Sequence, residues 1–345
     1  MKRQILHVDV NNAFLSWTAI QRLKQGEELD IRTIPAIIGG DEEARKGVVL
    51  AKSIKAKEFG ITTGEPIYFA RKKCPKVKIY SSDMETYKYY SNQLYQLLLQ
   101  YTEKIERFSI DECFLDMTEY LMNRTLLEIA YEINKRVKKE LGFTVNIGVA
   151  HNKLLAKMAS DFTKPDKVHT LFEEEIAEKM WQIPVSELFM IGKKSVPKLK
   201  LLGIKTIGDL ARYNKNELEK QFGKAGKTMW EYANGIDNSE VYYEVEKPKG
   251  IGNSTTLPRD IYNIEELNKI ILTLTEQVTY RLRKQKMLAS VVNVQLKTKE
   301  FKIMSHQRKM FCPTNQTIEI YKQAKELLKE LYKGEGIRLV RSKSR

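Results

Sequence analysis

The chain contains few of the residues on which small secreted or membrane-bound proteins depend. Only three cysteines occur among 345 residues, Cys74, Cys113 and Cys312. This odd, widely spaced set argues against a disulfide framework or a zinc knuckle and suits a reducing compartment. No apolar run approaches the ~20 residues of a membrane span. Asp9 stands where a signal peptide needs apolar residues, and no small-residue cleavage site follows. We therefore expect neither secretion nor membrane insertion, and a cytoplasmic location.

Acidic residues are outnumbered, with 44 Asp and Glu against 59 Lys and Arg, which gives a formal net charge of +15. A hydrophobic content of 42% with 30% charged residues is typical of a globular protein. The length suits roughly two to four domains. Excess positive charge attracts polyanions, of which nucleic acid is the commonest large one; ribosomal surfaces, anionic lipid and solubility alone are the alternatives.

Strands and helices alternate through about the first 165 residues. Residues 5–10 are apolar and rich in β-branched side chains, which predicts a buried strand that contains Asp9. Hydrophobic spacing and breaker residues predict the remaining elements: helices over 14–23, 84–105, 126–141 and 152–161, and strands over 48–51, 107–117 (broken near Asp111) and 144–150. This βαββαβ order, with an insertion after the first strand, fits a ferredoxin-like sheet.

The second half of the chain has a different character. Residues 173–222 read as short helices separated by glycines, and residues 235–249 as a linker with little periodicity. Alternating apolar and polar residues over 292–296 predict a half-buried strand. Predicted helices over 264–284 and 317–333 flank it, which indicates a small α+β domain.

Three carboxylates lie within strand-like apolar sequence. Asp9 ends one predicted strand, and Asp111 and Glu112 interrupt another. Buried acids are costly unless they are paired or bind a cation. No Lys or Arg neighbours them in sequence, so a divalent cation would relieve their repulsion if the two strands were adjacent. Hard oxygen ligands favour magnesium over zinc, and two such ions about 4 Å apart support phosphoryl transfer.

A simpler interpretation is that Asp111 and Glu112 are ordinary hairpin residues. Neighbouring residues in a regular strand face opposite sides of the sheet. Both could therefore bind one metal site only if the chain turns or bulges between them.

Four segments together resemble the Y-family DNA polymerases, with the DinB or polymerase IV type as the nearest branch. They are Val-Asp-Val-Asn-Asn-Ala-Phe at 8–14, Ser-Ile-Asp-Glu at 109–112, Gly-Val-Ala-His-Asn-Lys-Leu-Leu-Ala-Lys at 148–157, and Lys164-Pro165. The resemblance covers nearly the whole chain. It implies an α+β multidomain, right-handed polymerase with a ferredoxin-like palm, small fingers, a helical helix-hairpin-helix thumb and an α+β little finger. The implied boundaries are palm 1–12 and 80–168, fingers 13–79, thumb 169–234, linker 235–247 and little finger 248–345.

The resemblance also implies an activity and its cofactor. Asp9, Asp111, Glu112 and the Val10 carbonyl would hold two Mg²⁺, with Mn²⁺ able to substitute. The ions would align a primer 3′-hydroxyl with the α-phosphate of a dNTP, in low-fidelity translesion synthesis without proofreading. Primer-template DNA and dNTP are the implied partners of a monomer.

Three further residues match nucleotide contacts of the family. Phe14 falls at the steric-gate position, where an aromatic ring would exclude a ribose 2′-hydroxyl. Lys57 and Lys164 match contacts to the triphosphate, for which an ammonium is a suitable partner. By sequence alone, Phe14 would be a core residue and both lysines solvated surface residues.

DNA contacts are expected in two regions. Gly192-Lys193 and Gly223-Lys224 lie in two hairpin-like turns whose N–H groups could approach phosphates, although helix-capping glycines are the alternative. The segment between 281 and 309 contains a cluster of basic residues and a single acid, Glu300. This composition suits a sheet that follows the phosphate backbone of DNA, and a solvated basic face is the alternative. The basic residues are Arg281, Arg283, Lys284, Lys286, Lys297, Lys299, Lys302, Arg308 and Lys309.

The chain departs from the family pattern at several positions. Ile54 and Lys57 replace a Tyr and an Arg on the triphosphate, and Ile54 cannot donate a hydrogen bond, so nucleotide affinity or insertion rate is expected to be lower. The other departures are Asn11 for a second Asp, Ala13 for an aromatic, Leu50 for a small residue and Met190 for a hairpin glycine. Residues 337–345 lack the sliding-clamp peptide of many bacterial relatives, so clamp contact is absent or internal, or the sequence is truncated.

Two other functions fit parts of the sequence. A non-catalytic Y-family-like protein that only binds DNA and partners would be expected to have lost the carboxylates, and all three are present. A nucleotidyl cyclase on the same palm-type fold would need neither the thumb hairpins nor the basic C-terminal domain.

Overall fold

The computed structural model describes residues 2–40, 47–244 and 248–345. Three parts of the predictions therefore lie outside the described residues: Met1, residues 41–46 of the predicted fingers and residues 245–247 of the predicted linker. The chain divides into two compact units, which comprise Met1–Ile38, Ala51–Ile61 and Lys76–Val245, and Gly39–Leu50, Thr62–Pro75 and Glu246–Arg345. None of the helices in the described ranges is both long enough and apolar enough to cross a bilayer.

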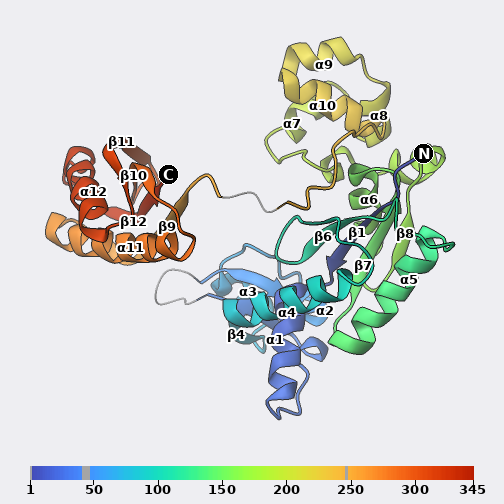
Figure 1. The fold of residues 1–345 in the computed structure, drawn as a ribbon, viewed down its shortest axis with the longest axis horizontal. Helices are drawn as coiled ribbons and strands as arrows, with labels where there is room; N and C mark the ends of the chain where they lie inside the picture. Colours follow the sequence, from blue (N-terminus) through green and yellow to red (C-terminus); the bar gives the residue numbers. More distant parts are fainter. Residues whose placement is uncertain (1, 41–46, 245–247) are drawn as a thin grey trace. The chain divides into compact units, whose positions relative to one another are not determined.

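A five-stranded sheet forms the centre of the first unit (Figure 1). Its strand order is β5-β6-β1-β7-β8, in which β1 pairs antiparallel with β6 and β7, and β8 runs parallel to β7. The strands are β1 (Ile5–Val10), β5 (Ile105–Arg107), β6 (Glu112–Asp116), β7 (Val145–Ala150) and β8 (Val168–Thr170). The first four have the predicted ferredoxin-like arrangement, and β8 adds an edge strand.

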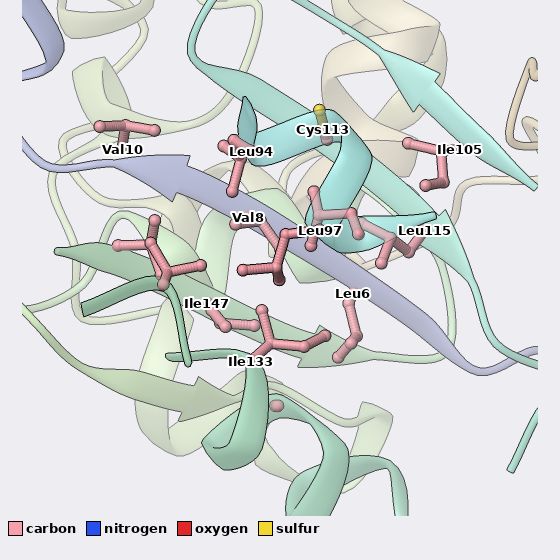
Figure 2. Packing of buried hydrophobic residues seen from close by; sticks show 14 of the residues in the cluster. Leu6, Val8, Val10, Leu94, Leu97, Ile105, Cys113, Leu115, Ile133 and Ile147 are labelled. Atoms are coloured by element: carbon pink, nitrogen blue, oxygen red, sulfur yellow. The ribbon is translucent and has the colours of Figure 1, made fainter. Parts of the chain in front are cut away.

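Three helices pack on one face of this sheet, α1 (Ala13–Lys24), α4 (Met84–Leu98) and α5 (Leu126–Arg136). Because side chains alternate along a strand, β1 presents Leu6, Val8 and Val10 to these helices. Figure 2 shows Leu6 and Val8 packed among Leu94, Leu97 and Ile133. This face is a continuous apolar core.

One predicted helix ends earlier than the periodicity indicates, and another changes type before its predicted end. The helix predicted over 84–105 ends at Leu98, because Ile105–Arg107 pairs as β5 with β6. The helix predicted over 126–141 changes at Val137 to a π-helical turn, η2 (Val137–Leu141), which Gly142 ends at φ 80°. A left-handed residue at this position is the usual helix terminator, and glycine adopts it without strain.

The opposite face of the sheet carries Ile5, His7 and Asp9 and is covered by α6 (Lys153–Ser160). Asn152 caps this helix by accepting a hydrogen bond from the Leu155 N–H. A Cβ at Gly148 of β7 would lie 1.8 Å from the Ala156 carbonyl oxygen. The backbone of α6 therefore lies directly against β7, where only glycine fits.

The predicted short helices follow the sheet and share the core on its α6 face. They are η3 (Glu173–Glu175), η4 (Ile176–Met180), η5 (Val185–Glu187), α7 (Val196–Leu201), α8 (Ile207–Arg212) and α9 (Lys215–Phe222). A further helix, α10 (Lys224–Ala233), follows beyond the predicted range. The described part of the predicted linker has no regular structure, yet it is held against the sheet. Asp237 accepts from the Leu154 N–H, and Glu106 from the Tyr242 N–H.

The insertion after β1 forms a second, three-stranded sheet with the order β3-β2-β4. Its elements are η1 (Ile31–Thr33), β2 (Ala36–Gly39), β3 (Val49–Lys52), α2 (Ile54–Glu58), α3 (Ile67–Lys73) and β4 (Lys78–Ser81). Ser53 starts α2 by accepting from the Ala56 N–H. The strand predicted over 48–51 is β3, displaced by one residue.

The C-terminal residues form a four-stranded antiparallel sheet with the order β11-β10-β12-β9 and two helices on one face. The elements are β9 (Ile251–Ile261), α11 (Ile264–Lys284), β10 (Ala289–Thr298), β11 (Ile303–Thr314), α12 (Thr317–Leu331) and β12 (Ile337–Ser344). Val292, Val294 and Leu296 face the helices, as the alternation predicts. The predicted α11 is confirmed, and α12 ends two residues before its predicted end.

Candidate active site

Two of the predicted carboxylates are direct neighbours across the five-stranded sheet. Asp9 of β1 and Glu112 of β6 are register partners in the antiparallel pair, so their side chains share one face. Asp111 precedes β6 in the turn, and its carbonyl accepts a hydrogen bond from the Val10 N–H at 3.0 Å. Because Asp111 lies in the turn and Glu112 starts the strand, strand alternation does not separate them. The structure thus brings all three acids to one end of β1.

Two lysines that are distant in sequence occupy this carboxylate cluster. Lys157 Nζ lies 2.8 Å from Glu112 Oε1 and 3.6 Å from Asp9 Oδ2. Lys164 Nζ lies 2.5 Å from Asp9 Oδ2. Asp161 binds both ammonium groups, at 3.2 Å and 3.0 Å. No Lys or Arg neighbours these acids in sequence, yet two lysines pair with them in space because α6 and the loop after it fold back over the sheet.

Sequence analysis assigned no role to Lys157 or Asp161. Both lie in the segment that follows β7, and Lys157 belongs to one of the recognised motifs. Their spacing of four residues along α6 is a signal for a pair on one helix face. That spacing does not reveal that the pair faces Asp9.

Burial and charge act against each other in this cluster. Burial raises the pKa of Asp9 and of Glu112, because a low dielectric disfavours their charged forms, and the nearby lysines only partly offset it. Burial opposes the charged forms of Lys157 and Lys164, but Asp9 and its neighbouring carboxylates raise the pKa of both lysines above the ordinary value. The charged state of each partner therefore depends on the other.

The donor set fits a divalent cation in chemistry, although the carboxylates are not gathered around one point. Within the described ranges, no three His, Cys, Asp or Glu side chains converge closely enough to hold a metal ion. The Asp111 carboxylate accepts a hydrogen bond from Ser109 Oγ at 2.6 Å, and Lys157 contacts both Asp9 and Glu112. Carboxylate oxygens are the ligands that Mg²⁺ prefers, and the two ammonium groups show that the cluster already binds positive charge. A metal ion would replace lysine contacts.

Asn11 explains how Lys164 reaches Asp9. The Asn11 amide donates to Asn146 Oδ1 at 3.1 Å and accepts from the Asp166 N–H at 2.8 Å. Asn146 in turn donates to the Thr163 carbonyl at 2.9 Å. A carboxylate at position 11 could not make the donating bond. The departure from the family pattern at this position therefore holds the loop that carries Lys164.

Phe14 follows a sharp turn at the end of β1. Asn12 adopts the left-handed conformation with φ 51°, which Asn tolerates better than most residues, and α1 starts at the next residue. The Phe14 ring stacks on Tyr87 of α4, with 4.6 Å between centroids and 23° between planes. Tyr87 is fully buried, and its ring supports one face of the half-buried Phe14 ring. The sequence did not single out Tyr87, and the gate role of Phe14 stays a prediction.

The other nucleotide-contact positions lie in the insertion. Ile54 and Lys57 are one turn apart on α2 and both exposed, and Leu50 of β3 is partly exposed. A contact between Lys57 and a triphosphate stays a prediction.

Both predicted hairpin turns are present among the short helices. Gly192 and Lys193 are exposed before α7, and Gly223 adopts φ 63° between α9 and α10, where Lys224 begins the helix. Met190 has φ 69°, a left-handed conformation that glycine adopts without cost. This is the position where the family pattern has glycine.

The basic residues of the C-terminal sheet lie on two different faces. Lys297 is on the face opposite the helices, together with Asn293 and Gln295. The register places Arg341 beside Gln295 and Lys343 beside Asn293. We call this set, Asn293, Gln295, Lys297, Arg341 and Lys343, the open face. Sequence analysis missed Arg341 and Lys343, although apolar and polar residues alternate around them.

The remaining predicted DNA contacts do not join the open face. Arg308 pairs in register with Val292, on the helix side, and its guanidinium binds Glu326 at 2.8 Å and Glu330. Arg281 and Arg283 lie on α11 and donate to backbone carbonyls. Lys299 lies in the turn after β10 beside Glu300. Strand alternation separates residues that are close in sequence, so these four residues do not form one surface with Lys297.

Comparisons with known proteins decide the family. A model of the impB/mucB/samB family matches residues 8–161, its C-terminal domain matches 248–342, and a DNA polymerase-iota thumb domain matches 187–237. The chain is 48% identical over 340 residues to a DNA polymerase IV of Clostridium acetobutylicum, across 99% of this chain and 86% of that protein. It is 39% identical to a DNA polymerase IV of Acetivibrio thermocellus, across 95% and 81%. The chain belongs to the DinB-like Y-family DNA polymerases.

Solved Y-family structures share its fold. A Y-family DNA polymerase chimera superposes with a TM-score of 0.86 at 24% identity, over 99% of this chain and 98% of the other. DinB from Sulfolobus solfataricus superposes with a TM-score of 0.65 at 24% identity and the same coverage. The α+β prediction with palm, helix-hairpin-helix thumb and little finger is confirmed. The thumb-domain match covers α7 to α10, and the C-terminal-domain match covers most of the four-stranded sheet.

Proposed function

We propose that Asp9, Asp111 and Glu112 are the catalytic carboxylates with which this Y-family DNA polymerase extends a primer. The enzyme is a DNA-directed DNA polymerase of the translesion class. One observation supports this site above all others, the pairing of Asp9 with Glu112 in register beside Asp111. A purely DNA-binding relative would have no reason to keep three acids in this costly arrangement.

Divalent metal is the cofactor of this family, and the donor set fits two Mg²⁺, with Mn²⁺ able to substitute. Asp9, Asp111, Glu112 and the Val10 carbonyl would hold the ions. When bound, they would lower the pKa of the primer 3′-hydroxyl and stabilise the negative charge on the phosphates. The adjacent ends of β1 and β6 would hold these carboxylates beside the reacting groups.

Other side chains would position the dNTP. Lys164 is 38% exposed and lies on a loop, so it can leave Asp9 for an incoming triphosphate. Lys57 of α2 would add a second ammonium. Phe14, supported by Tyr87, would lie beneath the sugar and exclude a ribose 2′-hydroxyl.

Primer-template DNA would contact the thumb and the little finger. Both residues of each turn, Gly192-Lys193 and Gly223-Lys224, are exposed. The open face has no acid among its five residues, so Lys297, Arg341 and Lys343 present unopposed positive charge to phosphates. We expect sequence-independent, salt-sensitive binding.

The remaining expectations concern the assembly. We expect a monomer in the cytoplasm that synthesises DNA without proofreading.

Primer extension by an Asp111→Asn variant tests the site. Asp111 is partly exposed and bonded through its side chain to Ser109, so the variant should fold. We expect extension to fall at least about 100-fold, as when a group that stabilises transition-state charge is lost. Glu119→Gln is the control, because Glu119 is a 69% exposed carboxylate of the same unit that pairs with Lys104. Wild-type extension by Asp111→Asn would show that the site is assigned wrongly.

Incubation with nucleotide in the absence of DNA tests the cyclase alternative. A polymerase should form no cyclic product under these conditions. Cyclisation that Asp111→Asn abolishes would favour the cyclase.

A further inference from the structure

One lysine in the carboxylate cluster has no role in the function proposed above. The Lys157 side chain is 9% exposed, against 38% for Lys164. We propose that Lys157 is a resident counter-ion, a positioning residue that neutralises Asp9 and Glu112 before divalent cations bind and so sets the metal concentration that the enzyme requires. This inference rests on the proposed function, because it takes Asp9 and Glu112 as metal ligands.

The backbone at Lys157 is held close to β1. The Ser160 hydroxyl donates to the Lys157 carbonyl at 2.8 Å and contacts Nδ1 of the fully buried His7 at 2.8 Å. At Gly148 the helix backbone approaches β7 so closely that no Cβ fits between them. Lys157 therefore cannot withdraw by moving its helix. Only its flexible side chain can yield to another cation.

Lys164 differs from Lys157 in each of these respects. It lies on the loop between α6 and β8, and within the described ranges its ion pairs are with Asp9 and Asp161 and not with Glu112. Its more exposed ammonium can leave Asp9 to bind a triphosphate. The two lysines therefore have different roles. Lys157 stays with the carboxylates, and Lys164 leaves them to bind the nucleotide.

Glu112 depends on Lys157 for its neutralisation. Its Oε1 accepts from Lys157 at 2.8 Å, and its Oε2 lies 3.9 Å from Nε2 of His7, which has no hydrogen-bond partner. Within the described ranges, Lys157 is the one ammonium that binds Glu112. Loss of Lys157 would leave two neighbouring carboxylates to repel each other at a largely buried site.

The ammonium and a divalent cation compete for the same oxygens. A positive charge within about 4 Å of the binding position raises the free energy of a bound metal ion. Removal of that charge should thus have two opposite effects. The metal-free protein should become less stable, and its affinity for metal should rise.

Thermal unfolding of the full-length chain without DNA tests both effects, in EDTA and across a Mg²⁺ titration. For Lys157→Met we expect the Tm in EDTA to fall by about 5–15 °C, as for a broken buried ion pair. We expect the half-saturating Mg²⁺ concentration to fall by on the order of tenfold, with a larger Mg²⁺-induced rise in Tm. Lys157→Arg keeps the charge and should restore the wild-type Tm in EDTA.

Lys153→Met is the matched control. Lys153 lies on the same helix, is 13% exposed and binds the carboxylate of Glu106 at 2.6 Å. Its loss should lower the Tm equally with and without Mg²⁺. Lys157→Met behaving in the same way, or binding Mg²⁺ more weakly than wild type, would overturn the proposal. If Lys157→Met is unfolded in EDTA, Mg²⁺ should restore folding, and failure to do so would also count against it.

The proposed function and this inference fail separately. Normal primer extension by Asp111→Asn would remove the metal-site assignment itself. Loss of extension in Asp111→Asn, combined with an unchanged Mg²⁺ response in Lys157→Met, would leave the polymerase site intact and refute only the counter-ion role.

Discussion

Gly148 is the position at which one added methyl group should disturb the active site most. It lies on β7 opposite His7 of β1, and α6 crosses directly over it. An added Cβ would lie 1.8 Å from the Ala156 carbonyl oxygen and 2.7 Å from the Ser160 nitrogen. Both are backbone atoms, so no side-chain rotation can relieve the overlap. In Gly148→Ala, helix α6 must therefore move.

The structure sets the size of this effect. Ordinary contact begins at 3.4 Å, so the gap between 3.4 and 1.8 Å requires a displacement of about 1.6 Å. Overpacking of this kind costs about 3 kcal/mol or more. In a unit of this size, that lowers the Tm by about 6–12 °C. The same displacement would break the 2.8 Å contact between Lys157 and Glu112, and a 1 Å error in such a site costs about 100-fold in rate.

Calorimetry and primer extension together measure both consequences. Gly192→Ala is the control for the melting measurement alone, since a Cβ there meets no atom within 4 Å. Its Tm should stay within about 1 °C of wild type, as for an exposed substitution. If Gly148→Ala melts within 2 °C of wild type and extends primers normally, α6 does not press on β7 as described. The link between this contact and the active site would then be refuted.

Three further outcomes follow from other parts of the molecule. Phe14→Ala should admit ribonucleotides, measured as a rise in rNTP over dNTP incorporation, and unchanged discrimination would remove Phe14 from the gate. Arg341→Gln should reduce the slope of log affinity against log salt by about one for primer-template DNA, whereas Arg308→Gln should leave it unchanged because Arg308 is paired with acids of α12; equal slopes for both would refute the open face. Although burial opposes it, hydrogen bonds led by that of His151 lower the pKa of Glu173 from 4.5 to about 2. This lowered pKa stabilises the fold above pH 4.5 by about 1 kcal/mol after allowance for a 44% exposed side chain. The stabilisation is lost as the pH falls from 4.5 towards 2. In Glu173→Gln the plot of Tm against pH should therefore be flatter in that window, and an unchanged plot would refute a stabilising His151–Glu173 pair.

Much of the fold could be predicted because its elements carry strong local signals. Helix α11 was predicted to the residue, since its apolar stripe is long and Asn263 caps it. The helix predicted over 84–105 was too long, because residues 99–105 are locally compatible with a helix. Ile105 leaves it to pair with Leu115 of β6, a contact that no local pattern contains.

The DNA-binding prediction shows the same limit at a surface. A count of basic residues between 281 and 309 identifies the domain but not the side of its sheet. Arg308 and Lys297 are both basic strand residues, yet one binds acids of α12 and the other lies on the open face. Only the pairing of β10 with β12 adds Arg341 and Lys343 to that face.

The amino-acid order alone predicted the three candidate acids, the aromatic ring that follows the first of them and the strands that carry them. These features are local, since each depends on residue type, spacing and the turn or cap beside it. Tertiary structure alone decided that Lys157 and Lys164, with Asp161 beside them, lie against Asp9 and Glu112. Helix α6 and its following loop return across the sheet more than 140 residues after Asp9 and about 45 residues after Glu112. The strength of an ion pair depends on the distance between the two charges, and the fold of the backbone sets that distance.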